Sequence, residues 1–280
     1  ESTVTQPAAT ATQPAATPTE QVATEQTPEP AQGWWNDIVF YEIFVRSFYD
    51  SNGDGIGDFR GIVEKLDYLN DGDPNTTTDL GVSGIWLMPI FPSPSYHGYD
   101  VTDYQNVNPD YGTLQDFQDM VKACHERGIR VIIDFVVNHT SSEHPWFVSS
   151  KNKDSEYRNW YVWSDTKPSQ PGPWGQNAWY QSGGSFYYAP FWSGMPDLNY
   201  KEPKVTQAMY DATKFWRDLG VDGFRVDAAR YLVEEGVTLQ DSKGSIEWFQ
   251  NWRNYYLGIN PQPYTVAEVW TDTQTIAQYA

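Results

Sequence analysis

Two short segments each place a carboxylate at the end of an apolar run. The first reads Gly-Phe-Arg225-Val-Asp227. Residues two apart on a strand point to the same side, so Arg225 and Asp227 should project together from the strand's end. A neighbouring guanidinium favours the ionised form of a carboxylate, which a nucleophile requires. Taken alone, the same pattern also fits a structural ion pair.

The second segment reads Ala-Glu268-Val-Trp270 and ends the next apolar run. Apolar and aromatic neighbours favour the protonated form of a carboxyl group, which is the form that a general acid needs. Two carboxylates on adjacent strands can face each other across a glycosidic bond, and a gap of about 5–5.5 Å suits cleavage with retention of configuration. Asp227 and Glu268 are therefore a candidate nucleophile and a candidate general acid.

Two further segments carry histidines at expected strand ends. His139 closes the run that begins at Asp134, and the segment His97-Gly-Tyr99-Asp100 follows the apolar run before it. A single histidine in a loop is usually structural. The position of both segments at successive strand ends favours a shared site.

Residues 50–58 alternate oxygen-bearing side chains with glycines. Oxygen ligands at alternate positions in a tight turn suit a hard cation, so this segment predicts a Ca²⁺ site. The candidate ligands are the side chains of Asp50, Asn52, Asp54 and Asp58 and the carbonyl group of Ile56. A turn rich in Gly and Asp without a metal is the alternative.

Apolar and amphipathic runs alternate from residue 34 onward. The expected strands cover residues 38–45, 82–90, 129–137, 221–226 and 264–269, and the expected helices cover residues 59–69, 114–127, 203–219 and 245–257. Apolar strands separated by helices predict an α/β fold whose parallel sheet is covered on both faces. The repetition predicts a (β/α)8 barrel of the TIM type, with an open doubly wound sheet as the alternative. A barrel carries its active site at the C-terminal strand ends, where the carboxylates and histidines fall.

One connection is too long for an ordinary loop between a strand and a helix. Residues 140–196, after the third strand, are rich in Trp, Tyr, Gly, Pro and Ser. Such loops usually have 2–6 residues. We therefore expect an irregular domain inserted over residues 139–199, with aromatic side chains that wall a sugar cleft, and a barrel built from residues 34–138 and 200–280.

The composition favours a neutral ligand. The chain has 18 Lys and Arg against 37 Asp and Glu, a formal net charge of -19 and 16% aromatic residues. This charge disfavours nucleic acid and anionic membrane surfaces, and aromatic rings can stack on the C–H faces of sugars. No apolar run approaches the roughly 18 residues of a membrane span. The single cysteine, Cys124, excludes an intramolecular disulfide and is expected to be buried in a helix.

Residues 1–33 have a different character from the rest. They contain no aromatic residue, Lys or Arg, and the hexapeptide Thr-Gln-Pro-Ala-Ala-Thr occurs at residues 5–10 and 12–17. Such a segment cannot bury a core, so we expect a disordered tether. Tethers of this kind indicate an extracellular protein that is secreted or held at the cell surface. A cloning remnant or a cytosolic tail is the alternative.

Together, these motifs resemble the conserved segments of glycoside hydrolase family 13, the α-amylase family, in the family's order and spacing. The resemblance implies that Asp227 attacks the anomeric carbon, that Arg225 positions it, and that Glu268 is the general acid/base. It also implies that His139 and Tyr99 contact the bound sugar. Residues 50–58 resemble the family's calcium loop.

Other residues refine the resemblance. His97 and Asp100 belong to the matching substrate segment, and exo-acting relatives use the Asp to grip a terminal sugar. Asn138 matches a ligand of a second calcium in many α-amylases. The segment from Met195 to Asn199 resembles a group intermediate between oligo-1,6-glucosidases and neopullulanases.

Two features depart from the family's pattern. After Asp227 the chain reads Ala228-Ala-Arg-Tyr, where typical α-amylases have a Lys-His pair that grips the leaving side of starch, although Ala228 favours α-1,4 over α-1,6 cleavage. Strands six to eight and the family's later His-Asp pair are not found. We therefore expect a barrel truncated after strand five, a fragment that would not turn over well alone.

The leading hypothesis is retaining hydrolysis of α-1,4-glucosidic bonds in starch-like α-glucans or maltooligosaccharides. An exo-acting α-glucosidase or a glucosyltransferase of the same family is an alternative. A non-catalytic member, such as the ectodomain of a transporter heavy chain, usually lacks the catalytic carboxylates. A carbohydrate-binding module would need only surface aromatics.

Overall fold

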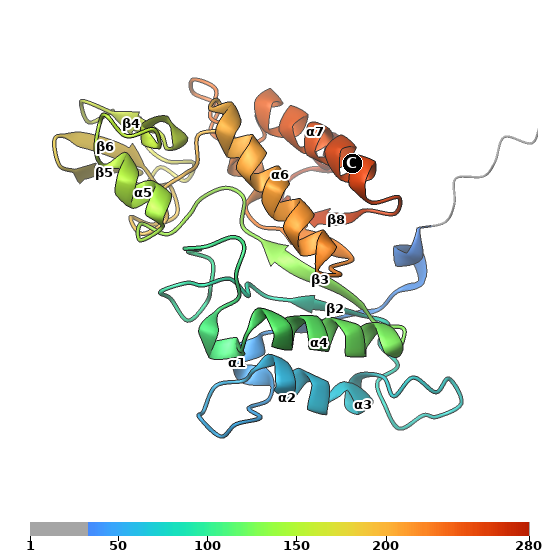
Figure 1. The fold of residues 1–280 in the computed structure, drawn as a ribbon. Coiled ribbons are helices and arrows are strands. Elements are labelled where there is room, and N and C mark those ends of the chain that lie inside the picture. The colour runs from blue at the N-terminus through green and yellow to red at the C-terminus, as the bar shows by residue number, and fades with distance from the viewer. Residues whose placement is uncertain (1–32, 280) are drawn as a thin grey trace, which may run out of the picture. The chain divides into compact units, whose positions relative to one another are not determined.

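The computed structural model describes residues 33–279 and contains five parallel strands in one sheet (Figure 1). The order is β1-β2-β3-β7-β8, and the strands span Phe40–Ile43, Gly84–Leu87, Arg130–Phe135, Gly223–Val226 and Tyr264–Ala267. Each strand pairs in parallel with the next one along the barrel wall, which is the arrangement of the first five strands of a (β/α)8 barrel. The predicted fold class is confirmed. The tether predicted for residues 1–33 lies outside the described residues, apart from Gly33.

Helices connect the strands and cover the sheet (Figure 1). The α-helices α1 to α8 span Val45–Phe48, Phe59–Glu64, Leu66–Leu69, Leu114–Glu126, Pro145–Ser150, Pro203–Asp218, Lys243–Ile259 and Thr273–Ile276. The 3-10 helices η1 to η4 span Trp34–Asp37, Pro109–Tyr111, Arg158–Trp160 and Ala229–Tyr231. The single helix predicted over residues 59–69 is wrong. Lys65 leaves helical geometry at φ -107°, and its N–H bonds to the Ile62 carbonyl group, which closes a tighter turn between α2 and α3.

Local sequence signals fix where the long helices begin. Thr113 and Asp116 form a reciprocal capping box at the start of α4. Glu202 caps α6, whose first residue is Pro203, and Ser242 caps α7. Each cap satisfies backbone N–H groups in the first turn of its helix.

The sheet is curved enough for side chains of its first and last strands to touch. The rings of Phe40 on β1 and Tyr264 on β8 stack with centroids 5.5 Å apart. A Cβ on Gly84 would lie 2.7 Å from the Phe40 ring, and one on Gly223 would lie 2.5 Å from the Tyr264 carbonyl oxygen. Glycine at both positions therefore permits the close approach of the residue paired with it on the neighbouring strand.

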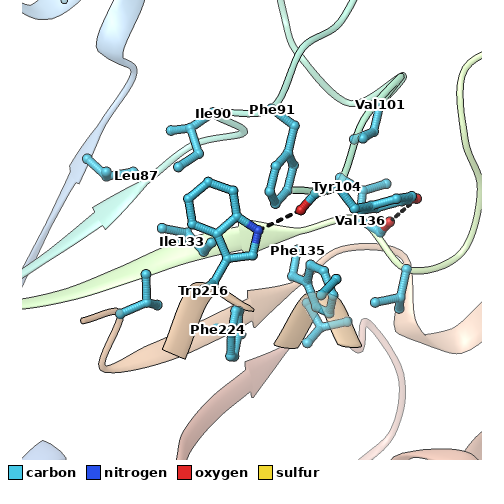
Figure 2. Packing of buried hydrophobic residues seen from close by; sticks show 14 of the residues in the cluster. Leu87, Ile90, Phe91, Val101, Tyr104, Ile133, Phe135, Val136, Trp216 and Phe224 are labelled. Atoms are coloured by element: carbon cyan, nitrogen blue, oxygen red, sulfur yellow. Dashed lines mark hydrogen bonds between the residues drawn. The ribbon is translucent and has the colours of Figure 1, made fainter. Parts of the chain in front are cut away.

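Buried residues packed against β3 hold in place the chain segment that follows this strand (Figure 2). Trp216 of α6 is fully buried against Phe91 and Phe117, and its indole N–H donates to the Tyr104 carbonyl oxygen at 2.7 Å. The Tyr104 hydroxyl donates to the carbonyl oxygens of Val136 and His139, at 2.8 and 2.9 Å. The chain that leaves β3 is thus hydrogen-bonded to the core up to His139.

The long connection between β3 and α6 carries its own small sheet. Strands β4, β5 and β6 span Trp163–Ser164, Trp179–Ser182 and Ser185–Tyr188 and pair antiparallel in the order β4-β6-β5. Single bridges join His139 to Asp197 and Tyr161 to Leu198, so the insertion closes where it leaves and re-enters the barrel. Within the described chain, we find no helix that combines the length and the apolar character needed to cross a membrane. Cys124 is buried in α4, as expected.

Candidate active site

The two candidate catalytic carboxylates lie at neighbouring strand ends. Asp227 directly follows β7 and Glu268 directly follows β8. These strands are hydrogen-bonded neighbours, with Val226 opposite Ala267. The next residue, Ala228, has φ +50°, a left-handed conformation that costs a residue with a Cβ roughly 1–2 kcal/mol. Backbone strain therefore sits beside Asp227, as it often does at functional sites.

One guanidinium joins three carboxylates at this end of the sheet. Arg225 donates through Nη1 to Asp227 Oδ1 at 2.8 Å and to both carboxylate oxygens of Asp134, at 3.0 and 3.1 Å. It donates through Nη2 to Glu268 Oε2 at 2.7 Å. The expected pairing of Arg225 with Asp227 is present. Its sharing with Asp134 and Glu268 leaves one positive charge among three acidic groups.

Burial shifts two of these carboxyl groups, those of Asp227 and Asp134, toward their neutral forms by raising their pKa. Burial raises the pKa of Asp227 to about 6, against the lowering effect of Arg225. Burial also raises the pKa of Asp134, which is fully enclosed, to about 8. The guanidinium thus acts in the predicted direction on Asp227, but burial has the larger effect. At neutral pH most Asp227 is still ionised.

Glu268 has a more polar setting than the sequence predicts. Besides the bond from Arg225, its Oε1 accepts the indole N–H of Trp270 at 2.9 Å. Its side chain is 33% exposed. The prediction that apolar groups surround Glu268 is therefore wrong for the described chain. Both carboxylate oxygens have a fixed donor, which defines the plane of the carboxylate.

These groups lie in a pocket of about 470 Å³. Five predicted residues line it: His97, Tyr99, His139, Asp227 and Glu268. Seven lining residues are additional: Trp174, Phe191, Met195, Ala228, Arg230, Tyr231 and Trp270. The insertion contributes Trp174, Phe191 and Met195, so its aromatic residues wall the pocket as predicted. A mostly apolar pocket with a few convergent polar groups is typical of a small-ligand site.

His139 offers a free hydrogen-bonding atom in this pocket. Its side chain is 2% exposed, and Nε2 has no partner among the described residues. Burial lowers the pKa of His139 to about 4, so the ring is neutral. A buried polar atom without a partner is costly unless a ligand satisfies it.

Tyr99 lies beside the buried carboxylates. Its hydroxyl donates to Asp134 Oδ2 at 3.2 Å, and its ring stacks on His97 with centroids 6.0 Å apart. Asp100, by contrast, does not line the pocket. It is 2% exposed, and its Oδ1 accepts from Ser93 at 2.6 Å and from Ser95. In this structure Asp100 supports the loop that carries His97 and Tyr99.

The predicted calcium loop is well ordered by its own backbone. Asp50 accepts N–H bonds from Asn52, Gly53 and Gly55, and these bonds, chiefly the one from Gly55, lower its pKa. Asp54 accepts from the Ile56 N–H at 2.8 Å. Asp58 is buried and caps α2 through the Gly61 N–H at 2.7 Å.

The oxygen donors predicted for calcium are thus close in sequence and ordered. In residues 33–279, however, no three His, Cys, Asp or Glu side chains gather as a metal centre. A cation in the loop would therefore need the Asn52 amide and the Ile56 carbonyl group, as well as new carboxylate orientations. This donor chemistry fits calcium.

Two residues that contact the carboxylate centre directly were not assigned a role in the site from the sequence: Asp134, and Trp270, which was expected only as an aromatic neighbour of Glu268. Asp134 interrupts an apolar strand, and a buried charge needs a partner, so this was a usable signal. Its partner, Arg225, lies opposite it in the register of β3 and β7. Trp270 follows Glu268 by two residues, and its contact with Glu268 depends on a loop conformation that has no sequence signature.

Comparisons with known proteins agree with this geometry. Residues 42–280 match the family model described as alpha amylase, catalytic domain. Alpha-amylase 3 of Dictyoglomus thermophilum is 47% identical over 247 residues, which cover 88% of this chain and 46% of that protein. An oligo-1,6-glucosidase of Parageobacillus thermoglucosidasius is 46% identical over 208 residues, covering 71% of this chain and 36% of that enzyme. This chain therefore spans less than half the length of either relative.

A solved structure shows the same arrangement of the backbone. The α-amylase from H. orenii superposes with a TM-score of 0.79 at 53% sequence identity, covering 86% of this chain and 49% of that one. The family model matches from within β1 onward and includes the inserted sheet and both carboxylate-bearing strand ends. The chain belongs to the α-amylase family of glycoside hydrolases, glycoside hydrolase family 13.

Proposed function

We propose that the protein hydrolyses α-1,4-glucosidic bonds in starch-like α-glucans or maltooligosaccharides, with retention of configuration. The observation that carries the proposal is the shared guanidinium of Arg225. Asp227 and Glu268 accept from its two terminal nitrogens, so they stand side by side in the pocket. Such proximity supports the short separation of about 5–5.5 Å used by retaining enzymes, rather than the wider gap that admits a water molecule.

In the proposed first step, an Asp227 oxygen attacks the anomeric carbon while the bond from that carbon to the leaving oxygen breaks. Glu268 gives its proton to the leaving oxygen, which departs as a sugar hydroxyl group. The product is a glycosyl ester of Asp227 with inverted configuration. In the second step, Glu268 takes a proton from water, and the hydroxide attacks the anomeric carbon and releases Asp227. Two inversions restore the original configuration.

The remaining pocket residues suit a neutral sugar. Nε2 of neutral His139 can hydrogen-bond a hydroxyl group, and the rings of Tyr99, Trp174 and Phe191 can pack on the C–H faces of the substrate. A non-catalytic member of the family would not need three acidic groups around one partly buried arginine. Keeping them there is electrostatically costly, which supports a catalytic role.

The bond specificity is tested by product analysis with the full-length protein. We expect amylose and maltoheptaose to be shortened from internal positions into several maltooligosaccharides, and isomaltose to be a much poorer substrate. Ala228, which follows the nucleophile and lines the pocket, motivates this expectation. Chromatography of early products is the measurement. Glucose as the sole early product would indicate an exo-acting α-glucosidase, and faster cleavage of isomaltose would contradict α-1,4 specificity.

We also propose that calcium binds to residues 50–58, and a second location in the fold offers donors of the same kind. Asn138 Oδ1, Asp197 Oδ2 and Glu234 Oε1 are buried oxygens without partners among the described residues. Asn138 also donates to Asp197 Oδ1 at 3.0 Å. Such oxygens fit a bound cation, because a buried polar atom without a partner costs free energy and a cation would satisfy it. Calcium at either place would stabilise loops at the strand ends.

Calcium should raise the melting temperature of the full-length protein. Only the folded loop presents its ligands together, so an ion at about 100 times its Kd adds roughly 2.7 kcal/mol to the free energy of unfolding. Asp54→Ala should lower this gain, whereas Asp73→Ala, in another exposed loop, should keep it. Differential scanning calorimetry with calcium and with a chelator makes the comparison. An equal gain in Asp54→Ala and the parent would rule out the 50–58 loop as a site.

A further inference from the structure

The arginine that replaces the expected Lys-His pair is held by an aspartate. Nε of Arg230 donates to both oxygens of Asp241, at 3.0 Å each, and Nη2 donates to Oδ2. Asp241 in turn donates its backbone N–H to the Arg230 carbonyl oxygen at 2.8 Å and accepts from the Tyr279 hydroxyl at 3.0 Å. The side chains of Arg230 and Asp241 are only 12% and 16% exposed, so solvent screens the pair weakly.

Asp241 adopts an uncommon backbone conformation in making this contact. Its φ is +52°, and Ala228 is the one other described residue besides glycine with a positive φ. A left-handed residue with a side chain costs roughly 1–2 kcal/mol, and Asp tolerates the conformation better than most. Such strain persists only where the surrounding contacts over-determine the backbone, and here those contacts are the ones to Arg230 and Tyr279.

The remaining terminal nitrogen of Arg230 reaches the loop that carries the general acid. Nη1 donates to the carbonyl oxygen of Trp270, and the Trp270 indole N–H donates to Glu268 Oε1 at 2.9 Å. The Trp270 side chain is 80% exposed, so packing does little to fix its orientation. Among the described residues, the bond from Arg230 holds the Trp270 backbone, and the bond to Glu268 holds its side chain.

We propose that Asp241 and Arg230 are positioning residues for Glu268. Asp241 orients the Arg230 guanidinium, Arg230 fixes the backbone at Trp270, and the Trp270 indole orients the Glu268 carboxyl group. The proposal rests on the proposed function, because it assigns Glu268 the role of general acid/base. It links the loop that follows the nucleophile strand, β7, to the loop that follows the acid strand, β8.

These contacts would act by setting the position of the Glu268 carboxyl group relative to the leaving oxygen of the substrate. Arg225 holds Oε2 of Glu268 and Trp270 holds Oε1, so the two donors together set the tilt of the carboxyl plane. Proton transfer requires the acid to lie within hydrogen-bonding distance of the leaving oxygen. A misplacement of about 1 Å at a reacting group can reduce a rate about 100-fold. Arg230 therefore does not act as a free cation that grips the leaving sugar.

The test uses the full-length enzyme and two substrates that differ in their need for acid assistance. Maltoheptaose has a poor leaving group and needs a well-placed acid, whereas 4-nitrophenyl α-maltoside releases a weakly basic phenolate and needs little. For Asp241→Asn and Trp270→Phe we expect kcat on maltoheptaose to fall about 10- to 100-fold, with KM nearly unchanged. On the aryl maltoside, the release of nitrophenol in the first turnover should change less than threefold. Asp67→Asn, which breaks the exposed pair with Arg127, is the matched control and should behave as the parent.

A double variant tests whether the contacts act in series. If Asp241 acts through Trp270, Asp241→Asn combined with Trp270→Phe should be no slower on maltoheptaose than the slower single variant. Multiplied losses in the double variant would overturn the proposal. So would equal losses on both substrates, or a rise in KM alone, since these indicate a structural role or a substrate contact. Trp270 is mostly exposed, so the Trp270→Phe variant should still fold. It therefore tests the proposal even if Asp241→Asn folds poorly.

The same assay separates failure of this proposal from failure of the proposed function. Glu268→Gln should itself be far more impaired on maltoheptaose than on the aryl maltoside. If Glu268→Gln shows no such difference, the acid role of Glu268 is wrong. If it does and neither Asp241→Asn nor Trp270→Phe follows it, only the positioning role is wrong.

Discussion

Asp227→Asn is expected to lower kcat of the full-length enzyme on maltoheptaose by roughly 10⁴- to 10⁶-fold, the scale seen when a nucleophile is removed. An amide oxygen is a poor nucleophile, so no glycosyl ester forms with any substrate. The amide has nearly the shape of the carboxylate, and Arg225 can still donate to its oxygen, so substrate binding should persist. Asp218→Asn, on the exposed face of α6, is the control and should stay within about twofold of the parent.

The burial of Asp227 also predicts how activity depends on pH. The nucleophile must be ionised, and burial raises the pKa of Asp227 to about 6. Its raised pKa means that protonation begins nearer to neutral pH than for an exposed aspartate, and that activity is lost as the pH falls through this value. We therefore expect the acidic limb of the kcat/KM profile to have its midpoint near pH 6. A midpoint near pH 4 would show that Arg225 dominates over burial in the full-length enzyme.

Glu268→Gln is expected to affect substrates unequally, and this is the second large effect. General acid catalysis contributes typically 10²- to 10⁴-fold, and glutamine cannot supply the proton, so hydrolysis of maltoheptaose should fall by that factor or more. The first step on 4-nitrophenyl α-maltoside should survive, because its leaving group needs little protonation. The second step should be slow, because no base activates water. Stopped-flow detection of nitrophenol should therefore show a burst followed by a slow phase.

A matched control accompanies this variant. Glu247→Gln removes another glutamate, one that pairs with Lys243 on the exposed face of α7, and should leave both substrates unaffected. A Glu268→Gln enzyme that loses both substrates equally, without a burst, would show that Glu268 does not act as acid and base.

The parts of the fold that local patterns determine could be predicted from the sequence. All five strands and the helices predicted at residues 114–127 and 203–219 are present, but four of the strands end two or three residues earlier than expected. The strand predicted to end at residue 226 does end there, directly before Asp227, whereas the strand predicted to end at residue 269 ends at Ala267, directly before Glu268. The break at Lys65 has no such pattern, because Phe59 to Leu69 keeps helical spacing throughout.

The electrostatics of the site could be predicted only in part. Arg225 and Asp227 share one strand, so their pairing follows from a period of two. The addition of Asp134 and Glu268 to the same guanidinium depends on the register of β3, β7 and β8, which the sequence does not encode locally. Burial has a larger effect than Arg225 on the pKa of Asp227, and this also depends on how the full site is enclosed. Trp174 reaches the pocket from an irregular loop and Arg230 from the short 3-10 helix η4, and no periodic pattern in the sequence predicts either position.

The most direct test is to trap the covalent intermediate. Glu268→Gln full-length enzyme would be mixed with 4-nitrophenyl α-maltoside, quenched in acid during the slow phase, digested and analysed by mass spectrometry. We predict that the peptide containing Asp227 gains the mass of one maltosyl unit and that fragmentation places it on the Asp227 side chain. A sugar attached to any other residue, or an unmodified peptide together with an inverted anomer in the product by NMR, would contradict the assignment of Asp227 as the nucleophile of a retaining reaction.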